Sequence, residues 1–402
     1  MFCLIMRVLI KKCDVLISII TLYLPPLSLK IKVCHLSSVH YAMDTRIFYK
    51  MCQALKENYE VDLIANHPKE EFVNGVKIVP FQPFKNRNIR VLFSWLLMFF
   101  KAIKQKASIY HFHDPELIPC GILLSMMGKK VIYDVHENIA EDIFDKPWIR
   151  NQKMAYRIFN FFEKRAVKRF HLILAEKSYQ KRYELLNANF SVVLNYCDID
   201  FFKKFEKKDF KQQLNLFYIG IVLENRGILE IIESVKQLKG KGMHVNFHVV
   251  GELYSDLSAK IKQLDYYDDI KRQLHFYGRK RLEEGYALAE KMDIGMCIIW
   301  PMKNSMESYP TKLFEYMAVG LPIITSSFPL YKEVVEGNQC GLCVSPRDSH
   351  EIAEAIETIH RDVLKTEQMS ENGKLAVKKH YDWESQKRVL IRVYKDIEEK
   401  IK

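Results

Sequence analysis

The feature that most constrains the fold of this chain is a series of short apolar segments, each followed by a helix-length stretch, that occurs twice along the sequence. The first series consists of residues 31–36, 61–65, 76–81, 108–112, 130–134, 171–175 and 191–194. The second consists of residues 216–221, 245–250, 275–277, 294–299, 322–325 and 341–344. Strands that alternate with helices are typical of βαβ units and parallel sheets. The sequence therefore predicts an α/β protein with two doubly wound, Rossmann-like domains that face a cleft.

The same pattern predicts where the domains begin and end. We expect an N-terminal domain over residues 31–195, a charged linker without periodicity over 196–213, and a C-terminal domain over 214–380. Residues 381–402 carry apolar side chains at helical spacing, which predicts a helix that packs back across the domains. A length of 402 residues exceeds what one hydrophobic core usually supports, so the length also favours two domains.

Residues 1–30 do not fit this pattern. Their longer apolar run, 15–24, is about half the length that a bilayer span needs, and no small-residue cleavage site follows it. Two interpretations stay open: a helix that lies on a membrane surface, or an over-long start ahead of the first strand.

Charge and cysteine content narrow the class of partner. A net charge of +12 indicates an anionic partner, which is a nucleic acid, an acidic membrane face or a phosphorylated small molecule. The nine cysteines show no CxxC or metal-ligand spacing, as expected for free thiols in a reducing cytosol. No GxGxxG follows any predicted strand, so a dehydrogenase is not favoured.

The segment "MESYPTKLFEYMAVGLPII", residues 306–324, combines two carboxylates with a predicted helix over 310–319. Pro310 suits the first helical turn and Gly320 the C-terminal cap. Leu313, Phe314 and Met317 share one face, which we expect to be buried, and Glu315 lies on the opposite side.

A nucleoside diphosphate explains this arrangement of charges. The free N–H groups at the helix start and Lys312 can meet the phosphates. Glu315 can accept hydrogen bonds from a ribose diol, and Glu307 from the hydroxyls of a sugar attached to the phosphates. The alternative is a solvated helix end with acidic residues at favourable N-terminal positions.

At these residues the chain resembles family 4 of the glycosyltransferases, retaining enzymes of the GT-B fold whose E-x7-E motif matches Glu307 and Glu315. The resemblance runs from about Lys32 to the end of the chain. The segments "SSVHYAMDTRIFYK" (37–50) and "YHFHDPEL" (110–117) resemble a branch of the family that builds bacterial surface polysaccharides such as capsule and lipopolysaccharide. The resemblance to this family implies transfer of a sugar from a UDP- or GDP-linked donor to an oligosaccharide or lipid-linked saccharide acceptor.

The resemblance also implies which residues bind the donor. In "LFYIGIVLENRGILEII" (216–232), Ile221 follows Gly220 where the family usually carries an arginine, and Arg226 replaces the usual lysine as the phosphate clamp. Gly278 and Arg279, after a later strand, are expected beside the nucleobase.

In the first domain, the resemblance makes His136 the active-site histidine that contacts the transferred sugar, so we predict Glu307 and His136 as catalytic residues. Five more residues are expected at the acceptor or along the cleft: His40, Asp44, Arg46, Asp114 and Glu116. Helix capping is the alternative role for Asp44 and for Asp114.

We expect neither a metal nor a cofactor besides the nucleotide-sugar. His111 and His113 lie on one strand face, whereas zinc sites need three or four convergent ligands, and the family is not metal dependent in general. The resemblance implies a front-face route to retention, in which the leaving phosphate takes the acceptor proton.

Two segments predict where the protein works. Residues 88–106 are apolar and then basic, and residues 150–170 are basic and aromatic, as a peripheral protein on an anionic membrane requires. We therefore expect a cytoplasmic location at the inner face of the plasma membrane and no nucleic-acid partner. A nucleotide-sugar epimerase of the same layout, or a non-catalytic partner that binds nucleotide-sugar or nucleic acid, remains the alternative.

Overall fold

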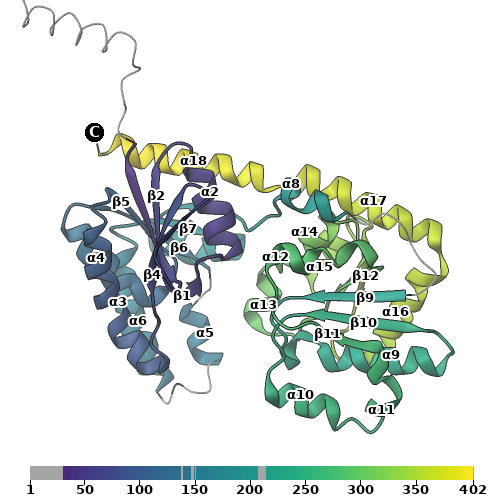
Figure 1. Cartoon of the computed structure of the whole chain (residues 1–402). Coiled ribbons are helices and arrows are strands. Elements are labelled where there is room, and N and C mark those ends of the chain that lie inside the picture. Colours follow the sequence, from purple (N-terminus) through teal and green to yellow (C-terminus); the bar gives the residue numbers. More distant parts are fainter. Residues whose placement is uncertain (1–29, 137–138, 146–148, 150, 207–213, 402) are drawn as a thin grey trace, which may run out of the picture.

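A computed structural model describes residues 30–136, 139–145, 149, 151–206 and 214–401, which form two α/β domains (Figure 1). The predicted extension lies outside the described residues except for residue 30, as does part of the predicted linker. The first domain contains an eight-stranded sheet of order β3-β4-β2-β1-β5-β6-β7-β8. The second contains a six-stranded sheet of order β11-β10-β9-β12-β13-β14. Two doubly wound sheets confirm the predicted fold class.

Each predicted strand position overlaps a strand of the structure. The first sheet comprises β1 (Lys32–Tyr41), β2 (Glu60–Asn66), β3 (Glu71–Val73), β4 (Val76–Phe81), β5 (Ile109–Phe112), β6 (Lys130–Val135), β7 (His171–Leu174) and β8 (Asn189–Val192). The second comprises β9 (Leu214–Ile219), β10 (Val245–Val250), β11 (Leu274–Phe276), β12 (Ile294–Cys297), β13 (Ile323–Ser326) and β14 (Gly341–Val344).

Strand β3 was not predicted. It pairs antiparallel with β4 through a two-residue turn, Asn74–Gly75, in which both residues have positive φ, 48° and 84°. An Asn-Gly pair between two short strands is the usual signal for such a hairpin. All other strand pairs in both sheets are parallel.

Helices cover both faces of each sheet. Those of the first domain are η1 (Thr45–Cys52, a π-helix), α2 (Gln53–Leu55), α3 (Arg87–Lys104), η2 (Pro115–Leu117), α4 (Ile118–Met126), α5 (Ile139–Asp145), α6 (Gln152–Ala166), η3 (Lys177–Tyr179) and α7 (Gln180–Leu185). Short helices α8 (Ile199–Phe202) and η4 (Lys203–Phe205) lead toward the second domain.

The second domain and the C-terminal segment contribute the remaining helices. They are η5 (Glu224–Arg226), α9 (Ile228–Gly240), α10 (Ser255–Lys262), α11 (Tyr267–Ile270), η6 (Lys271–Gln273), α12 (Leu282–Tyr286), η7 (Ala289–Lys291), α13 (Lys303–Glu307), α14 (Thr311–Ala318), α15 (Pro329–Val335), α16 (Ser349–Arg361), α17 (Val363–His380) and α18 (Trp383–Glu399).

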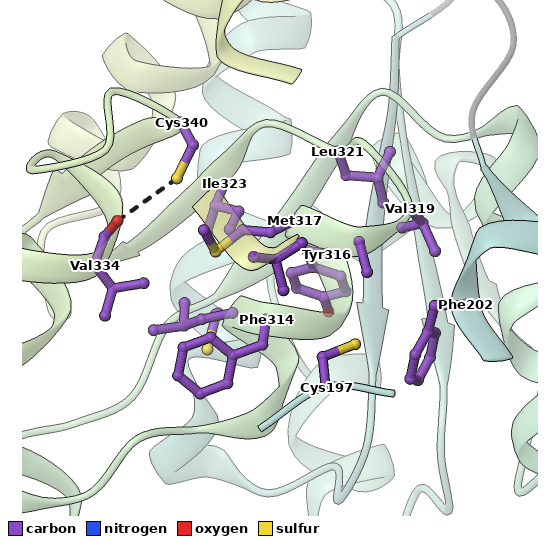
Figure 2. Close-up of a cluster of buried hydrophobic side chains, with 14 of the residues drawn as sticks. Cys197, Phe202, Phe314, Tyr316, Met317, Val319, Leu321, Ile323, Val334 and Cys340 are labelled. Atoms are coloured by element: carbon purple, nitrogen blue, oxygen red, sulfur yellow. Dashed lines mark hydrogen bonds between the residues drawn. The ribbon is translucent and has the colours of Figure 1, made fainter. Parts of the chain in front are cut away.

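Successive side chains of a strand point to opposite faces, so each sheet supports two cores. In β1, for example, Val33 packs in the core beneath α18 and Cys34 in the core beneath α3 and α4. Figure 2 shows one core of the second domain, where Phe314, Tyr316 and Met317 of α14 pack among residues of β13 and α15.

The chain passes between the domains twice, and the two passages lie side by side. The amide N–H of Cys197 donates to the carbonyl of Tyr381 at 3.0 Å, and the N–H of Trp383 donates to the carbonyl of Cys197 at 2.7 Å. After this point α18 returns to the first domain, where Leu390 and Tyr394 are buried in its core. Figure 1 shows α17 along the second domain and α18 along the first.

Candidate active site

The carboxyl end of β9 carries a glycine turn over which Lys312 passes. Gly220 has φ +133°, and a Cβ atom there would lie 2.9 Å from Cε and 3.2 Å from Nζ of Lys312. The Nζ atom itself lies 3.8 Å from the ring centroid of Tyr218. Gly220 is therefore required because a side chain at this position would displace the cation.

Arg226 is the second cation near the ends of these strands. Burial raises the pKa of the Cys297 thiol at the end of β12, and the positive charges of Lys312 and Arg226 act in the opposite direction. Both cations therefore lie close to the end of β12. Within the part of the chain that the structure describes, neither forms an ion pair with a carboxylate. Two uncompensated cations beside a glycine turn have the chemistry needed to hold an anion.

Glu307, which precedes α14 in the sequence, lies on a short helix. It is the last residue of α13 and is exposed. The helix is held by its own residues and by α15: Ser308 Oγ donates to the carbonyl of Asn304 at 2.7 Å, and the hydroxyl of Tyr331 donates to the carbonyl of Ser305 at 2.6 Å.

Helix α14 follows with the predicted ends. Pro310 occupies the N-cap position, and Gly320 has φ +74° just after the helix. Glu315 was expected on the side of the helix opposite the buried face, but that side is buried too: Glu315 is only 7% exposed, and its Oε2 accepts a hydrogen bond from the Tyr286 hydroxyl at 2.5 Å. The crossover residues Cys197 and Phe202 cover the side of α14 that the sequence pattern left open (Figure 2).

Lys50 of the first domain lies near Glu315, and the sequence analysis missed it. Its ammonium group donates to Asn195 Oδ1 at 2.7 Å. Burial lowers the pKa of Lys50 to about 8, although the charge of Glu315 acts in the opposite direction. A signal was present, since Arg46 and Lys50 are four residues apart among apolar neighbours and so share one buried helix face.

The centre of the first-domain site is Asp134, a fully buried carboxylate at the end of β6. Arg46 donates two hydrogen bonds to this carboxylate, from Nε to Oδ2 at 2.9 Å and from Nη2 to Oδ1 at 2.7 Å. His113 Nδ1 lies 3.1 Å from Oδ2. His136 Nε2 lies 2.6 Å from Oδ2, and 20% of its side chain is exposed. Burial alone would raise the pKa of Asp134, but Arg46 and then His136 hold that pKa well below its usual value.

A row of histidines continues from Asp134 to the C-terminal helix. His113 Nε2 lies 3.0 Å from His35 Nδ1, and His111 Nδ1 lies 2.8 Å from the hydroxyl of Tyr394 on α18. His111 and His113 stack with ring centroids 4.6 Å apart, which confirms that they share a strand face. Burial lowers the pKa of His35, His111 and His113, so these imidazoles are neutral at pH 7.

Two groups of side chains converge closely enough to hold a metal ion. They are His35, His111 and His113, and His113, Asp134 and His136, with ligand atoms within 4.8 Å of one another. His35, the register partner of His111 on β1, is the third ligand that the sequence analysis lacked. A divalent ion would add two positive charges to a buried region whose carboxylate is already paired with Arg46, at a large desolvation cost. We therefore keep the expectation of a metal-free reaction.

Strand β1 extends to Tyr41, and Asp114 binds the residues at its end. The carboxylate of Asp114 accepts hydrogen bonds from Ser37 Oγ at 2.8 Å and from the N–H of Ser38 at 2.6 Å. It makes no capping bond to η2, so the capping alternative for Asp114 is wrong. Glu116 accepts from Ser38 Oγ at 2.7 Å, and His40 Nε2 lies 3.4 Å from Asp114.

The capping alternative for Asp44 is confirmed. Its Oδ1 accepts hydrogen bonds from the N–H groups of Arg46 and Ile47, both at 2.9 Å. His40 Nδ1 lies 3.4 Å from the other carboxylate oxygen. Asp44 thus fixes the start of the π-helix that delivers Arg46 to Asp134, and π-helical turns are frequent at functional sites.

Several contacts join the carboxyl ends of the two sheets. The guanidinium of Arg279 in the second domain lies 4.0 Å from the ring centroid of Tyr41 in the first domain. The preceding residue, Gly278, has φ +68°, and its carbonyl accepts from the N–H of Gly251 at 2.9 Å within the second domain. The sequence analysis missed two further residues, Glu176 and Tyr179. They follow β7 and contact the segment around Glu307. The rule that pointed to His136, a polar residue after a strand, applies equally to Glu176.

Comparison with known proteins places both domains among the glycosyltransferases. Residues 45–186 match the family described as Glycosyltransferase Family 4, and residues 200–376 match Glycosyl transferases group 1. The amylovoran biosynthesis glycosyltransferase AmsK of Erwinia amylovora is 28% identical over 143 residues, which are 35% of each chain. The capsular polysaccharide biosynthesis glycosyltransferase CapM of Staphylococcus aureus is 25% identical over 164 residues, 41% of each. The match therefore spans well under half the length of these curated relatives.

Solved structures share the fold over almost the whole chain. Sucrose-phosphate synthase from Thermosynechococcus elongatus superposes with a TM-score of 0.74 at 15% identity, and covers 92% of this chain and 99% of its own. HepE of Anabaena in complex with UDP-glucose gives 0.66 at 14% identity, with 91% and 100% covered. WaaG, a glycosyltransferase involved in lipopolysaccharide biosynthesis, gives 0.67 at 14%, with 89% and 98% covered. At these identities the likeness establishes the fold alone.

The Arg46–Asp134 pair yields a prediction about stability. Asp134→Asn leaves the buried guanidinium without its counter-charge, so the free energy of unfolding should fall by about 3–5 kcal/mol in urea denaturation. The double variant Arg46→Met/Asp134→Leu removes both charges and should recover most of that loss. A double variant as unstable as the sum of its two single variants would contradict the account.

Proposed function

We propose that this chain, which belongs to the family 4 glycosyltransferases of the GT-B fold, transfers a sugar from a nucleotide-sugar to a saccharide acceptor during the synthesis of a surface polysaccharide. The observation that carries the proposal is the pair of unpaired cations, Lys312 and Arg226, at the glycine turn after β9. A donor diphosphate supplies the negative charge that these two side chains lack.

The donor is a UDP- or GDP-linked sugar. Lys312, Arg226 and the N–H groups at the start of α14 surround the place where charge develops as the diphosphate departs, and preorganised charges of this kind lower the barrier. Tyr286 occupies Oε2 of Glu315, so Oε1 is the oxygen that a ribose diol would reach. Ile221, in place of the family's usual arginine, leaves the diphosphate to these cations alone.

Glu307 and His136 hold the transferred sugar from opposite domains. Asp134 fixes the imidazole of His136 by the contact at Nε2, which leaves its other edge for the sugar. The bond between the anomeric carbon and the phosphate oxygen breaks, and the acceptor oxygen bonds to that carbon on the same face. The acceptor proton passes to the departing phosphate, so the reaction retains configuration without a protein nucleophile, metal or further cofactor.

The acceptor side comprises the end of β1 and the residues that it binds. His40, Asp114 and Glu116 form one hydrogen-bonded group there, and polar groups of this kind can receive saccharide hydroxyls. The matched families are both glycosyltransferases, so the comparisons give no support to an epimerase.

A membrane surface is the partner that fits α3 and α6. Helix α3 exposes Ile89, Val91, Leu92, Phe93, Leu96, Leu97 and Phe100. Helix α6 exposes Met154, Ile158 and Phe161 beside the cations Lys153, Arg157, Lys164 and Arg165. Both helices contact α4 on one face of the first sheet. Among the described helices, none has the length and apolar character needed to cross a membrane.

An apolar strip beside basic residues suits the anionic inner face of a plasma membrane, where a lipid-linked acceptor would be found. We therefore propose a cytoplasmic protein that binds this surface peripherally. Nucleic acid is not needed to explain the positive charge, since the donor and the membrane are both anionic.

The role of Glu307 can be tested by substitution. Glu307→Ala should lower the rate of sugar transfer by about 10²-fold or more, because a contact made to the reacting sugar is lost, and should leave nucleotide binding within about twofold. Glu354→Ala at an exposed position of α16 is the matched control. Transfer at a normal rate by Glu307→Ala would remove this residue from the mechanism.

The membrane surface can be tested by vesicle co-sedimentation. Leu92→Ser/Phe93→Ser should weaken binding to phosphatidylglycerol vesicles by about tenfold or more, since burying one such side chain contributes about 1.5–3 kcal/mol. Leu364→Ser/Leu375→Ser removes two residues of α17 that are even more exposed and should have no effect. Equal binding by both double variants would exclude α3 as the docking surface.

A further inference from the structure

One short segment of the first domain contacts the second domain on both sides of Glu307. It is the stretch from Glu176 to Tyr179, which follows β7. Glu176 Oε1 accepts a hydrogen bond from the N–H of Tyr309 at 3.3 Å, and the hydroxyl of Tyr179 lies 3.3 Å from Asn304 Oδ1. Asn304 and Tyr309 enclose Glu307 in the sequence, so the stretch fastens the whole of α13.

The same hydroxyl also reaches the first domain's proposed catalytic residue. Tyr179 donates to the backbone carbonyl of His136 at 3.1 Å. One phenol group therefore bridges the segment that carries His136 and the segment that carries Glu307. Tyr179 itself is 2% exposed and packs in the first-domain core, so it is a rigid support rather than a mobile surface group.

We infer that Glu176 and Tyr179 are positioning residues. They hold α13 against the first domain so that Glu307 and His136 can contact the same transferred sugar. This inference rests on the proposed function, because it assigns a purpose to the contact between the two catalytic residues' segments. Neither residue needs to touch the reacting atoms.

The shape of α13 makes such a support necessary. The helix has five residues, and a helix that short is not stable by itself. Glu307 is exposed at the end of this helix. Its position therefore depends on the contacts that Tyr179 and Glu176 make to Asn304 and Tyr309. A displacement of about 1 Å at a catalytic group is enough to lower a rate by about 10²-fold.

Glu176 adds a dependence on pH. Four charged or titratable groups face it: Arg46 from η1, Tyr196 from the crossover, Tyr309 from the α13–α14 connection and Tyr331 from α15. Burial raises the pKa of Glu176 to about 8, against the smaller opposite effects of the Tyr309 N–H and Arg46. The one cation among the four, Arg46, is already paired with Asp134.

The arrangement in which Glu176 contacts Tyr309 therefore contains a neutral Glu176. The pKa of Glu176 in that arrangement lies above the ordinary value for a glutamate. The contact therefore stabilises the arrangement fully at a pH below the ordinary glutamate pKa, and this stabilisation is lost as the pH rises through about 8. Above that pH the ionised carboxylate of Glu176 gains more from hydration than from its contact with Tyr309. The segment around Tyr309 then separates from the first domain.

Substitutions distinguish positioning from general structural support. Tyr179→Phe and Glu176→Ala should lower kcat by about 10–100-fold, with the dissociation constant for UDP or GDP within about twofold of wild type. Glu176→Gln keeps an oxygen that can accept from Tyr309 and cannot ionise, so its kcat should lose the decline near pH 8 that the wild type shows. Glu184→Gln at an exposed position of α7 is the matched control and should keep the wild-type profile.

Hydrogen exchange gives a measurement that does not depend on activity. The amide of Tyr309 should exchange at least about tenfold faster in Glu176→Ala than in the wild type, whereas buried β12 amides should be unchanged. Unchanged exchange at Tyr309, or an active wild type whose kcat survives Tyr179→Phe and Glu176→Ala within twofold, would overturn the inference. A wild type that transfers no sugar from any donor would instead refute the proposed function, and the exchange result would still decide whether the contact exists.

Discussion

Burial of the Asp134 carboxylate is the constraint on which the first domain depends. An ionised group without solvent must be neutralised, and Arg46 does this with two hydrogen bonds. The π-helix that carries Arg46 is in turn started by Asp44, so the loop after β1 is fixed by a charge on β6. The same carboxylate orients His113 and His136, and a hydrogen-bonded row through His35 reaches Tyr394 on the C-terminal helix. His136, the proposed catalytic histidine, and the return of α18 to this domain therefore share one electrostatic support.

The site of the second domain has the opposite charge balance, because it has an excess of positive charge. Lys312 and Arg226 lie at the end of the central strands without a described carboxylate partner, and Gly220 keeps a side chain out of the space that Lys312 occupies. A Cβ atom on Gly227 would lie 2.3 Å from Cγ2 of Ile298, so the turn is pressed against the strand end. Such a site is incomplete until an anion arrives. The proposed reaction needs this contrast between a charge-balanced site in the first domain and an excess of positive charge in the second.

Features that depend on neighbouring residues in the sequence were predictable, and features that depend on tertiary contacts were not. The strand positions and both ends of α14 follow from local patterns, namely short apolar runs, Pro310 and Gly320. The burial of Glu315 does not, because the residues that cover it, Cys197 and Phe202, come from the crossover more than a hundred positions away. His35 joins His111 only through strand register, and Asp114 turns away from its own helix to the end of β1. Local spacing holds no information about either choice.

The central claim is that a diphosphate binds between Lys312 and Arg226, and a calorimetric titration tests it most directly. UDP, GDP and the corresponding nucleosides would be titrated into the wild type and into Lys312→Met/Arg226→Met. The account predicts that the double variant loses at least about 100-fold in affinity for the diphosphate that the wild type prefers, since each charge-assisted contact contributes about 1.5–3 kcal/mol, while nucleoside binding is unchanged. Equal diphosphate affinity in the two proteins would contradict it.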